Sequence, residues 1–254
     1  MRLAICQCSP SEVQPRDRLE RMSAAMDSED ADVYVFPEMV LTGYVHGDCR
    51  DSVPECIRAV HAEAVRRGCC IVFGAPEYLG KTEYNCAYAV SDEGTAVYRK
   101  IHLPGFGAFR EDRMYCPGES PTVFDYRGVR FGLSICYDIF FPELLKWNSM
   151  HGASVNICIS ASPVTSRPAF EKVLPARAIE NTSYLVFVNN VGQCGDLEFF
   201  GSSRVLSPLG DPMVSVEGTG TAVAVLDGDV LTAARTGRPV LKDTVDLNRG
   251  RFSR

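Results

Sequence analysis

The sequence of 254 residues has no apolar run long enough to cross a membrane and no excess of basic charge. Its longest apolar stretches, such as residues 153–161, fall far short of the ~20 residues that a membrane-spanning helix needs. A net charge of −6 argues against nucleic acid or an anionic membrane surface as the main partner. Met1 leads directly into strand-like residues 3–5, without the basic and then apolar pattern of a signal peptide. We therefore expect a cytoplasmic protein with neither nucleic acid nor membrane as partner.

Several common chemical signatures are also missing. None of the 11 cysteines forms a Cys-x-x-Cys pair, and the four histidines form no ligand pair with them, so no metal site is expected. The absence of Gly-x-Ser-x-Gly argues against a serine α/β-hydrolase. Residues 218–221, Gly-Thr-Gly-Thr, are interpreted as a turn, because no helix pattern follows them as it would follow a phosphate-binding loop.

Strand-like and helix-like segments alternate along the chain, and no linker-like tract, repeat or low-complexity segment separates them. The pattern predicts a single α/β domain over residues 1–254 with mixed β-sheets. Residues 235–254 are basic with little periodicity, and are interpreted as a C-terminal arm that packs on the body or on another subunit. Helical spacing is found in residues 16–26, 52–67, 141–151 and 168–181, and strand-like runs in 3–8, 33–36, 69–74, 84–90, 95–99, 131–136, 155–159, 185–189, 202–206, 213–216 and 222–226.

The most informative short segment is an apolar run that ends in Cys136. It predicts a buried strand, and the helical pattern of residues 141–151 begins soon afterwards with Pro142 in its first turn. A residue at such a junction exposes its side chain on a sharp turn, beside backbone N–H groups that point outward. Cys136 is therefore a candidate nucleophile, and the N–H of Tyr137 is a candidate donor to a developing oxyanion.

Two further predicted strands end in charged side chains, Glu38 and Lys100. A cysteine attacks a carbonyl as a thiolate, so a base must take its proton, and a carboxylate buried after an apolar segment can serve as that base. Lys100 is suited to stabilising the oxyanion, and Glu111 to positioning the lysine or the leaving group. Strand ends bring such side chains to one edge of an α/β sheet, where Glu38, Lys100 and Cys136 would meet.

The segments around these residues resemble the glutamate, lysine and cysteine motifs of the nitrilase superfamily of carbon–nitrogen hydrolases. Further resemblances follow in the family's order and extend over nearly the whole chain. The matching segments are Phe36-Pro37-Glu38-Met39-Val40-Leu41-Thr42-Gly43-Tyr44, Arg99-Lys100-Ile101-His102-Leu103-Pro104, Cys136-Tyr137-Asp138-Ile139-Phe140-Phe141-Pro142-Glu143, Ser160-Ala161-Ser162-Pro163, Arg177-Ala178-Ile179-Glu180-Asn181, Asn189-Asn190-Val191-Gly192 and Phe200-Gly201-Ser202-Ser203-Arg204 with Pro208-Leu209-Gly210.

The resemblance implies a four-layer α-β-β-α sandwich with mixed β-sheets that assembles as a homodimer or a higher homo-oligomer. It implies Glu38 as general base, Lys100 as the oxyanion-stabilising acid, Cys136 as nucleophile and Glu111 as the second glutamate that positions substrate and lysine. No metal or organic cofactor is expected. The implied reaction is acyl transfer through a thioester, in which ammonia or an amine leaves first and water attacks second.

Three residues are the candidates for contact with the substrate. Cys136-Tyr137-Asp138 resembles amide-hydrolysing members, whereas true nitrilases tend to place Trp-Glu after the cysteine. Phe106 falls where glutamine-using members often place a tyrosine, and Ser162 falls near a position that some of them use to hold substrate. We therefore predict hydrolysis of a small carboxamide, of the ω-amide type, with Tyr137, Phe106 and Ser162 near the substrate.

Two alternatives stay open at this point. An N-carbamoyl amine or N-carbamoyl amino acid hydrolase would use the same residues on a ureido carbonyl, and would release CO2 together with ammonia. A binding or regulatory protein on the same fold would have lost turnover. His102 is interpreted as a histidine that hydrogen-bonds locally, because Glu38 already supplies the base.

Overall fold

The computed structural model describes residues 1–10, 15–43, 49–107 and 109–245, so Tyr44 of the glutamate motif and the last nine residues of the predicted arm lie outside the described residues. The strands are β1 (Arg2–Gln7), β2 (Val33–Val35), β3 (Cys70–Leu79), β4 (Thr82–Ser91), β5 (Gly94–Arg99), β6 (Val123–Tyr126), β7 (Val129–Ile135), β8 (Val155–Ser160), β9 (Tyr184–Asn189), β10 (Val191–Cys194), β11 (Leu197–Phe200), β12 (Ser203–Leu206), β13 (Pro212–Val216) and β14 (Gly220–Val225).

The helices include three short ones that the sequence pattern did not predict, α3, α6 and α7. The α-helices are α1 (Pro15–Asp27), α2 (Val53–Arg67), α3 (Glu111–Met114), α4 (Pro142–Met150), α5 (Arg167–Asn181), α6 (Gly228–Gly237) and α7 (Val240–Asp243). Two 3₁₀ turns, η1 (Cys136–Phe140) and η2 (Val164–Ser166), precede α4 and α5. No helix in these described ranges has both the length and the apolar character needed to cross a bilayer.

Two six-stranded mixed sheets organise the part of the chain that the structure describes. One has the order β14-β1-β2-β3-β4-β5, and the other has the order β13-β12-β9-β8-β7-β6. The strands β1, β2 and β3 are parallel in the first sheet, and β7, β8 and β9 are parallel in the second. The β4–β5 pair forms the hairpin predicted from Ser91-Asp92-Glu93-Gly94. The β10–β11 hairpin forms a separate two-stranded sheet.

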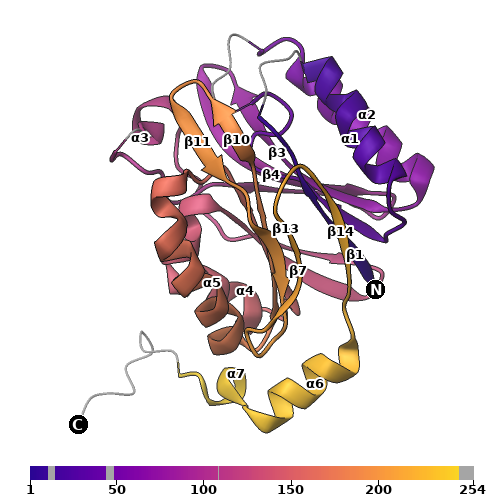
Figure 1. Cartoon of the computed structure of the whole chain (residues 1–254), viewed down its shortest axis with the longest axis vertical. Helices are drawn as coiled ribbons and strands as arrows, with labels where there is room; N and C mark the ends of the chain where they lie inside the picture. Colours follow the sequence, from indigo (N-terminus) through magenta and orange to yellow (C-terminus); the bar gives the residue numbers. More distant parts are fainter. Residues whose placement is uncertain (11–14, 44–48, 108, 246–254) are drawn as a thin grey trace.

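The sheets pack face to face, and helices cover their outer faces (Figure 1). Apolar side chains from β1, β2, β7 and β8 form one buried cluster between the sheets, including Leu3, Val35, Leu133 and Ile157. A second cluster lies under α1 and α2 and includes Met22, Val60 and Phe73. The helices α4 and α5 pack on β7 and β9 of the other sheet. This arrangement confirms the predicted four-layer α-β-β-α sandwich.

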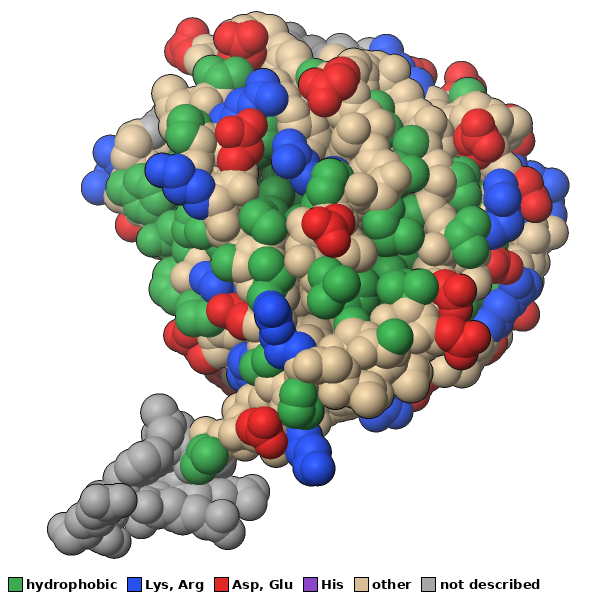
Figure 2. Space-filling model, turned by 60° about the horizontal axis from the view of Figure 1, so that its bottom comes forward, with side chains coloured by type: hydrophobic (Ala, Val, Ile, Leu, Met, Phe, Trp, Pro, Cys, Tyr) green, Lys and Arg blue, Asp and Glu red, His purple; other side chains and the backbone are tan. Residues whose placement is uncertain are grey.

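The alternation of apolar residues predicted most elements but missed β6, β10, β11, α3 and the two helices at the C-terminal end. The sequence placed an arm at residues 235–254, whereas α6 already begins at Gly228 and continues to Gly237. Asp227 accepts a hydrogen bond from the N–H of Asp229 and caps this helix. The described face in Figure 2 carries acidic and basic side chains side by side, as expected from the nearly balanced counts of the two charges.

Gly74 of β3 lets the segment that carries Glu38 lie directly against the sheet. A Cβ atom at this position would lie 2.3 Å from the backbone nitrogen of Met39 and 2.6 Å from Cα of Glu38. Both are backbone atoms of a segment that hydrogen bonds hold against β3, including the one from Gly74 N to Pro37 O at 3.1 Å. The close approach therefore requires glycine.

We expect Gly74→Ala to lower the free energy of unfolding by about 2–3 kcal/mol, because the added methyl group overpacks a backbone contact that cannot relax. Denaturant unfolding followed by circular dichroism would measure the change. Gly218→Ala is the matched control, since its added Cβ would have no atom within 4 Å. Equal stabilities of the two variants would contradict this account of the contact.

Candidate active site

The predicted site residues follow strands whose ends meet at one edge of the two sheets. Glu38 comes three residues after β2, Lys100 directly after β5 and Cys136 directly after β7. Glu111 opens the short helix α3. Glu38, Lys100 and Glu111 each influence the pKa of the Cys136 thiol, which places all four groups in one electrostatic neighbourhood. The fold thus brings together the four residues that the sequence singled out as catalytic candidates.

Lys100 lies between two carboxylates in a fully buried position. Its Nζ donates to Glu38 Oε1 at 2.9 Å and to Glu111 Oε1 at 2.9 Å. Burial alone would lower the pKa of Lys100, but the carboxylates of Glu111 and Glu38 outweigh burial and hold that pKa well above its usual value. Lys100 therefore stays protonated and provides a fixed positive charge in a site with little water.

Glu38 is also fully buried, and each of its carboxylate oxygens has a protein donor. Oε1 accepts from Asn85 Nδ2 at 2.7 Å in addition to Lys100, and Oε2 accepts from the N–H of Ala161 at 2.7 Å. Burial raises the pKa of Glu38 above its usual value, although Lys100 opposes this shift. A carboxylate with a raised pKa is suited to accept a proton and to return it near neutral pH.

Cys136 has a backbone conformation that favours glycine, with φ +48°. Cys136 follows β7 directly and begins the turn η1, so its side chain no longer follows the alternation of the strand. Strain of this kind at a nucleophile is common where a sharp turn presents the side chain. Burial, the Glu38 charge and Glu111 raise the pKa of the thiol to about 12, with Lys100 opposing. The thiol is therefore protonated at rest and needs a base to become a nucleophile.

Asp138 holds the turn that carries Cys136. Its buried carboxylate accepts from the N–H of Ile135 at 3.0 Å and from the Tyr98 hydroxyl at 2.8 Å. The other oxygen accepts from the N–H of His102 at 3.1 Å and lies 2.8 Å from His102 Nδ1. The local hydrogen bonding predicted for His102 is confirmed. Asp138 thus ties the cysteine turn to the segment that follows Lys100, a role that the sequence pattern did not reveal.

Aromatic rings surround the residue that follows the cysteine. Tyr137 is half-buried, and its ring makes edge contacts with Phe106 and Phe141, with centroids 5.1 Å apart in each pair. Phe106 is 53% exposed. The His102 ring stacks on the Phe141 ring, with the two centroids 3.6 Å apart. Phe106 and Tyr137 therefore form an apolar wall beside Cys136.

Ser162 lies next to the nucleophile in a fully buried position. Its Oγ is 3.2 Å from Cys136 Sγ and 2.6 Å from Ser160 Oγ. The sequence predicted Ser162 as a contact for substrate, and the structure shows its hydroxyl engaged with two protein side chains. Asn85, Asn189 and Asn190 were not predicted as site residues, because their side-chain contacts join segments that are distant in sequence. Ser160 was not predicted either, although it lies two residues from Ser162.

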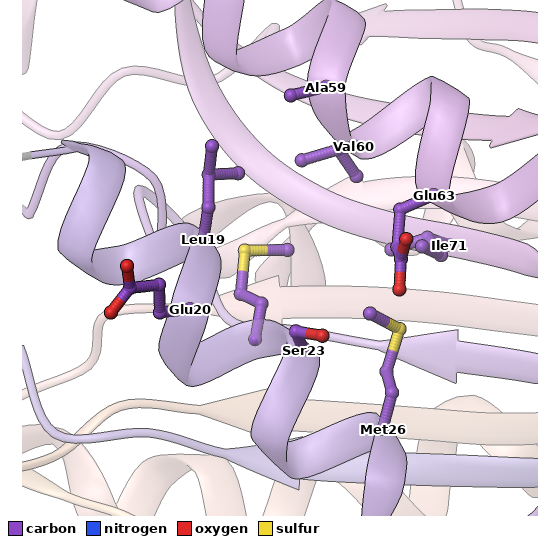
Figure 3. A pocket seen from close by; sticks show the side chains of 9 residues that line it. Leu19, Glu20, Ser23, Met26, Ala59, Val60, Glu63 and Ile71 are labelled. Carbon is purple, nitrogen blue, oxygen red and sulfur yellow. The ribbon is translucent and has the colours of Figure 1, made fainter.

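A separate hollow opens between α1 and α2 on the outer face of the first sheet (Figure 3). Figure 3 shows Leu19 and Met26 of α1 facing Val60 and Glu63 of α2 across it. Neither Glu38, Lys100 nor Cys136 lines this hollow. Among the described residues no group of histidine, cysteine and acidic side chains has an arrangement that could hold a metal ion. The buried Glu38–Lys100–Cys136 cluster is therefore the candidate active site.

Comparison with known proteins agrees with this fold and motif order. The family model of carbon–nitrogen hydrolases matches residues 2–236, and the chain belongs to that family. The (R)-stereoselective amidase of Pseudomonas sp. is 36% identical over 222 residues, which cover 84% of this chain and 80% of the amidase. The 2-oxoglutaramate amidase of Bacillus subtilis is 31% identical over 227 residues, which cover 85% of this chain and 86% of that enzyme.

A solved structure of an amidase variant from Nesterenkonia sp. AN1 is also similar. It matches with a TM-score of 0.79 at 27% identity and covers 93% of this chain and 94% of its own. In that structure the acetamide moiety of fluoroacetamide is covalently added at the active-site cysteine. These findings confirm the resemblance to the nitrilase superfamily on which the fold prediction rests.

Proposed function

We propose that the protein hydrolyses a small carboxamide through a thioester on Cys136, with Glu38 as base and Lys100 as oxyanion stabiliser. The buried cluster in which Lys100 bonds both Glu38 and Glu111 beside the Cys136 thiol carries this proposal. The amidase relatives and the covalent adduct on the cysteine of the Nesterenkonia amidase support it. They favour a carboxamide over the N-carbamoyl alternative and over a protein without turnover.

The acylation step follows from the positions of these groups. Glu38 takes the thiol proton as Cys136 Sγ bonds to the amide carbon, and the carbonyl oxygen becomes an oxyanion held by Lys100 Nζ and the N–H of Tyr137. Collapse of this intermediate breaks the C–N bond, and Glu38 returns the proton to the nitrogen, which leaves as ammonia. Glu111 keeps Lys100 in place through the bond to Nζ.

Hydrolysis of the thioester repeats the same proton transfers. Glu38 accepts a proton from water as the water oxygen bonds to the acyl carbon, and the second oxyanion occupies the site of the first. The C–S bond then breaks, the acid leaves and Cys136 recovers its proton from Glu38. The residues of this chain complete each step without a further reactant, and no cofactor is proposed.

Substrate selection is assigned to the aromatic wall, whereas Ser162 is assigned to the nucleophile. Phe106 is the exposed member of the wall and Tyr137 the half-buried one, so a small acyl group would contact both rings beside Cys136. Ser162 is proposed to influence the reaction indirectly, through Cys136, since its hydroxyl contacts the sulfur. We further propose a homodimeric, cytoplasmic enzyme, which light scattering of the purified protein and cell fractionation would test.

Release of ammonia from a panel of ω-amides, simple aliphatic amides, ureido compounds and nitriles tests the function directly. We expect the amides to give ammonia without CO2, because the leaving group departs from a carboxamide carbon. Equal release of CO2 and ammonia from a ureido compound, with no release from amides, would contradict the carboxamide assignment. No release from any compound by correctly folded protein would contradict turnover as proposed.

A further inference from the structure

Two buried serine hydroxyls lie beside the sulfur of Cys136, and the mechanism above does not use them. Ser160 ends β8, and Ser162 follows two residues later. Both side chains are fully buried, and their Oγ atoms are 2.6 Å apart, with Ser162 Oγ 3.2 Å from Cys136 Sγ. A hydrogen bond from Ser160 lowers the pKa of the thiol. The two residues, named the serine pair here, contact the nucleophile without taking part in the Glu38–Lys100 ion pair.

The number of protons in the serine pair determines that one hydroxyl donates a hydrogen bond to the sulfur. Two hydroxyl groups carry two protons, and only one of these can lie between the two oxygens. Among the hydrogen bonds of the described residues, the acceptors within reach of the pair's hydroxyls are the two oxygens themselves and Cys136 Sγ. A buried hydroxyl without an acceptor is costly, so the second proton points at the sulfur. This holds whichever serine is the final donor.

Two consecutive asparagines at the end of β9 hold the serine pair in place. Asn189 Oδ1 accepts from the N–H of Ser162 at 2.8 Å, and Asn189 Nδ2 donates to Ser162 O at 3.2 Å. Asn190 Nδ2 donates to the backbone oxygens of Glu38 at 3.0 Å and of Ser160 at 3.3 Å. The same dipeptide therefore fixes both serines and the backbone of the general base. Groups held from several directions keep their geometry during the reaction.

We propose that the serine pair donates a hydrogen bond to Cys136 Sγ that stabilises the thiolate, and that Ser160 and Ser162 are positioning residues for the nucleophile. The inference rests on the proposed function and deepens it. Sulfur carries negative charge twice in the cycle, when Glu38 removes its proton and when the C–S bond of the thioester breaks. A hydrogen bond to a charged acceptor is stronger than one to a neutral acceptor, so the pair favours both states.

Alkylation of Cys136 tests the proposal without any substrate, so its outcome is independent of the substrate assignment. Tryptic peptide 131–146 contains Cys136 as its only cysteine, and its mass reports the rate at this site among the 11 cysteines. We expect the double variant Ser160→Ala/Ser162→Ala to react with iodoethanol, an alkylating reagent without an amide group, about tenfold more slowly at pH 8, since losing this hydrogen bond raises the thiol pKa by about one unit. Each single variant should lose less, because the remaining hydroxyl can donate to the sulfur directly.

The matched control removes two buried serine hydroxyls elsewhere. Ser149 and Ser183 both accept from Asn156 Nδ2, each at 2.9 Å, so Ser149→Ala/Ser183→Ala changes the same number of buried hydroxyls beside a side chain other than Cys136. It should alkylate at the wild-type rate. The reaction with N-ethylmaleimide, a larger reagent, should slow by the same factor as the reaction with iodoethanol in the Ser160/Ser162 variant, because a shifted thiol pKa affects both reactions equally.

Steady-state kinetics on an amide that is turned over supply a second measurement. We expect kcat of the Ser160→Ala/Ser162→Ala variant to fall about tenfold with KM changed less than twofold, and each single variant to retain more of kcat. An unchanged alkylation rate in the folded double variant would overturn the proposal. A rise in KM with normal alkylation would also overturn it, and would assign the serines to substrate contact. If only the reaction with N-ethylmaleimide became slower, this would indicate blocked access to Cys136 and would equally contradict the proposal.

Discussion

Cys136→Ala is expected to lower kcat/KM for the best amide by at least about 10⁴-fold, because no other described side chain in the cluster can form the thioester. The loss should appear in kcat, since the aromatic wall of Phe106 and Tyr137 remains to bind substrate. The variant should fold, because the substitution removes a single sulfur from a residue that is 7% exposed. Ammonia release and thermal unfolding would be measured on the same preparation.

Cys70→Ala is the matched control for this variant. Cys70 is another buried thiol, 1% exposed in the core between the sheets, and it contacts no group of the proposed site. It should keep near wild-type kcat, with a modest loss of stability from the small cavity. Full activity of folded Cys136→Ala would contradict the nucleophile assignment, and equal losses in both variants would trace the effect to packing.

Lys100→Met is expected to have a large effect on both stability and turnover. The substitution leaves Glu38 and Glu111 buried without their cation, and breaking a buried ion pair by removal of one partner costs about 3–5 kcal/mol. The oxyanion also loses its charged donor, so kcat should fall by about 10²–10³-fold or more. Urea unfolding and ammonia release would measure the two effects, with exposed Lys172→Met of α5 as control.

The stability loss in Lys100→Met should depend on pH in a defined direction. Without the lysine, the buried Glu38 carboxyl loses the charge that opposes the effect of burial, so its pKa in the folded state rises further above its value in the unfolded chain. The cost at Glu38 is therefore absent below the unfolded pKa of about 4.3 and grows as the pH rises toward the folded pKa. The difference in unfolding free energy between wild type and variant should be larger at pH 7.5 than at pH 5. The opposite trend, or no trend, would contradict the buried charge cluster.

The sequence was sufficient to predict the order of most elements and to propose which groups react. Apolar residues at every second position and apolar faces at helical spacing are local patterns, which a sequence shows directly. They predicted the bounds of β4, β5, α2, α4 and α5 within a few residues. The resemblance of the motifs to one family supplied the sandwich and the pairing of Glu38, Lys100 and Cys136 as a site. The helix α6 was missed although it has an apolar face, on which Leu231 and Ala234 are buried.

The tertiary structure decided what surrounds those groups. Asn85 of β4 bonds Glu38, Asp138 links the cysteine turn to His102, and Asn190, which follows β9, fixes the backbone of Glu38. Each contact joins residues between 36 and 152 positions apart, so no local pattern in the sequence could predict it. The sequence by itself determined which atoms can react. Only the folding of distant segments around one edge of the sheets decided their protonation states, since burial and neighbouring charges set the pKa of a side chain.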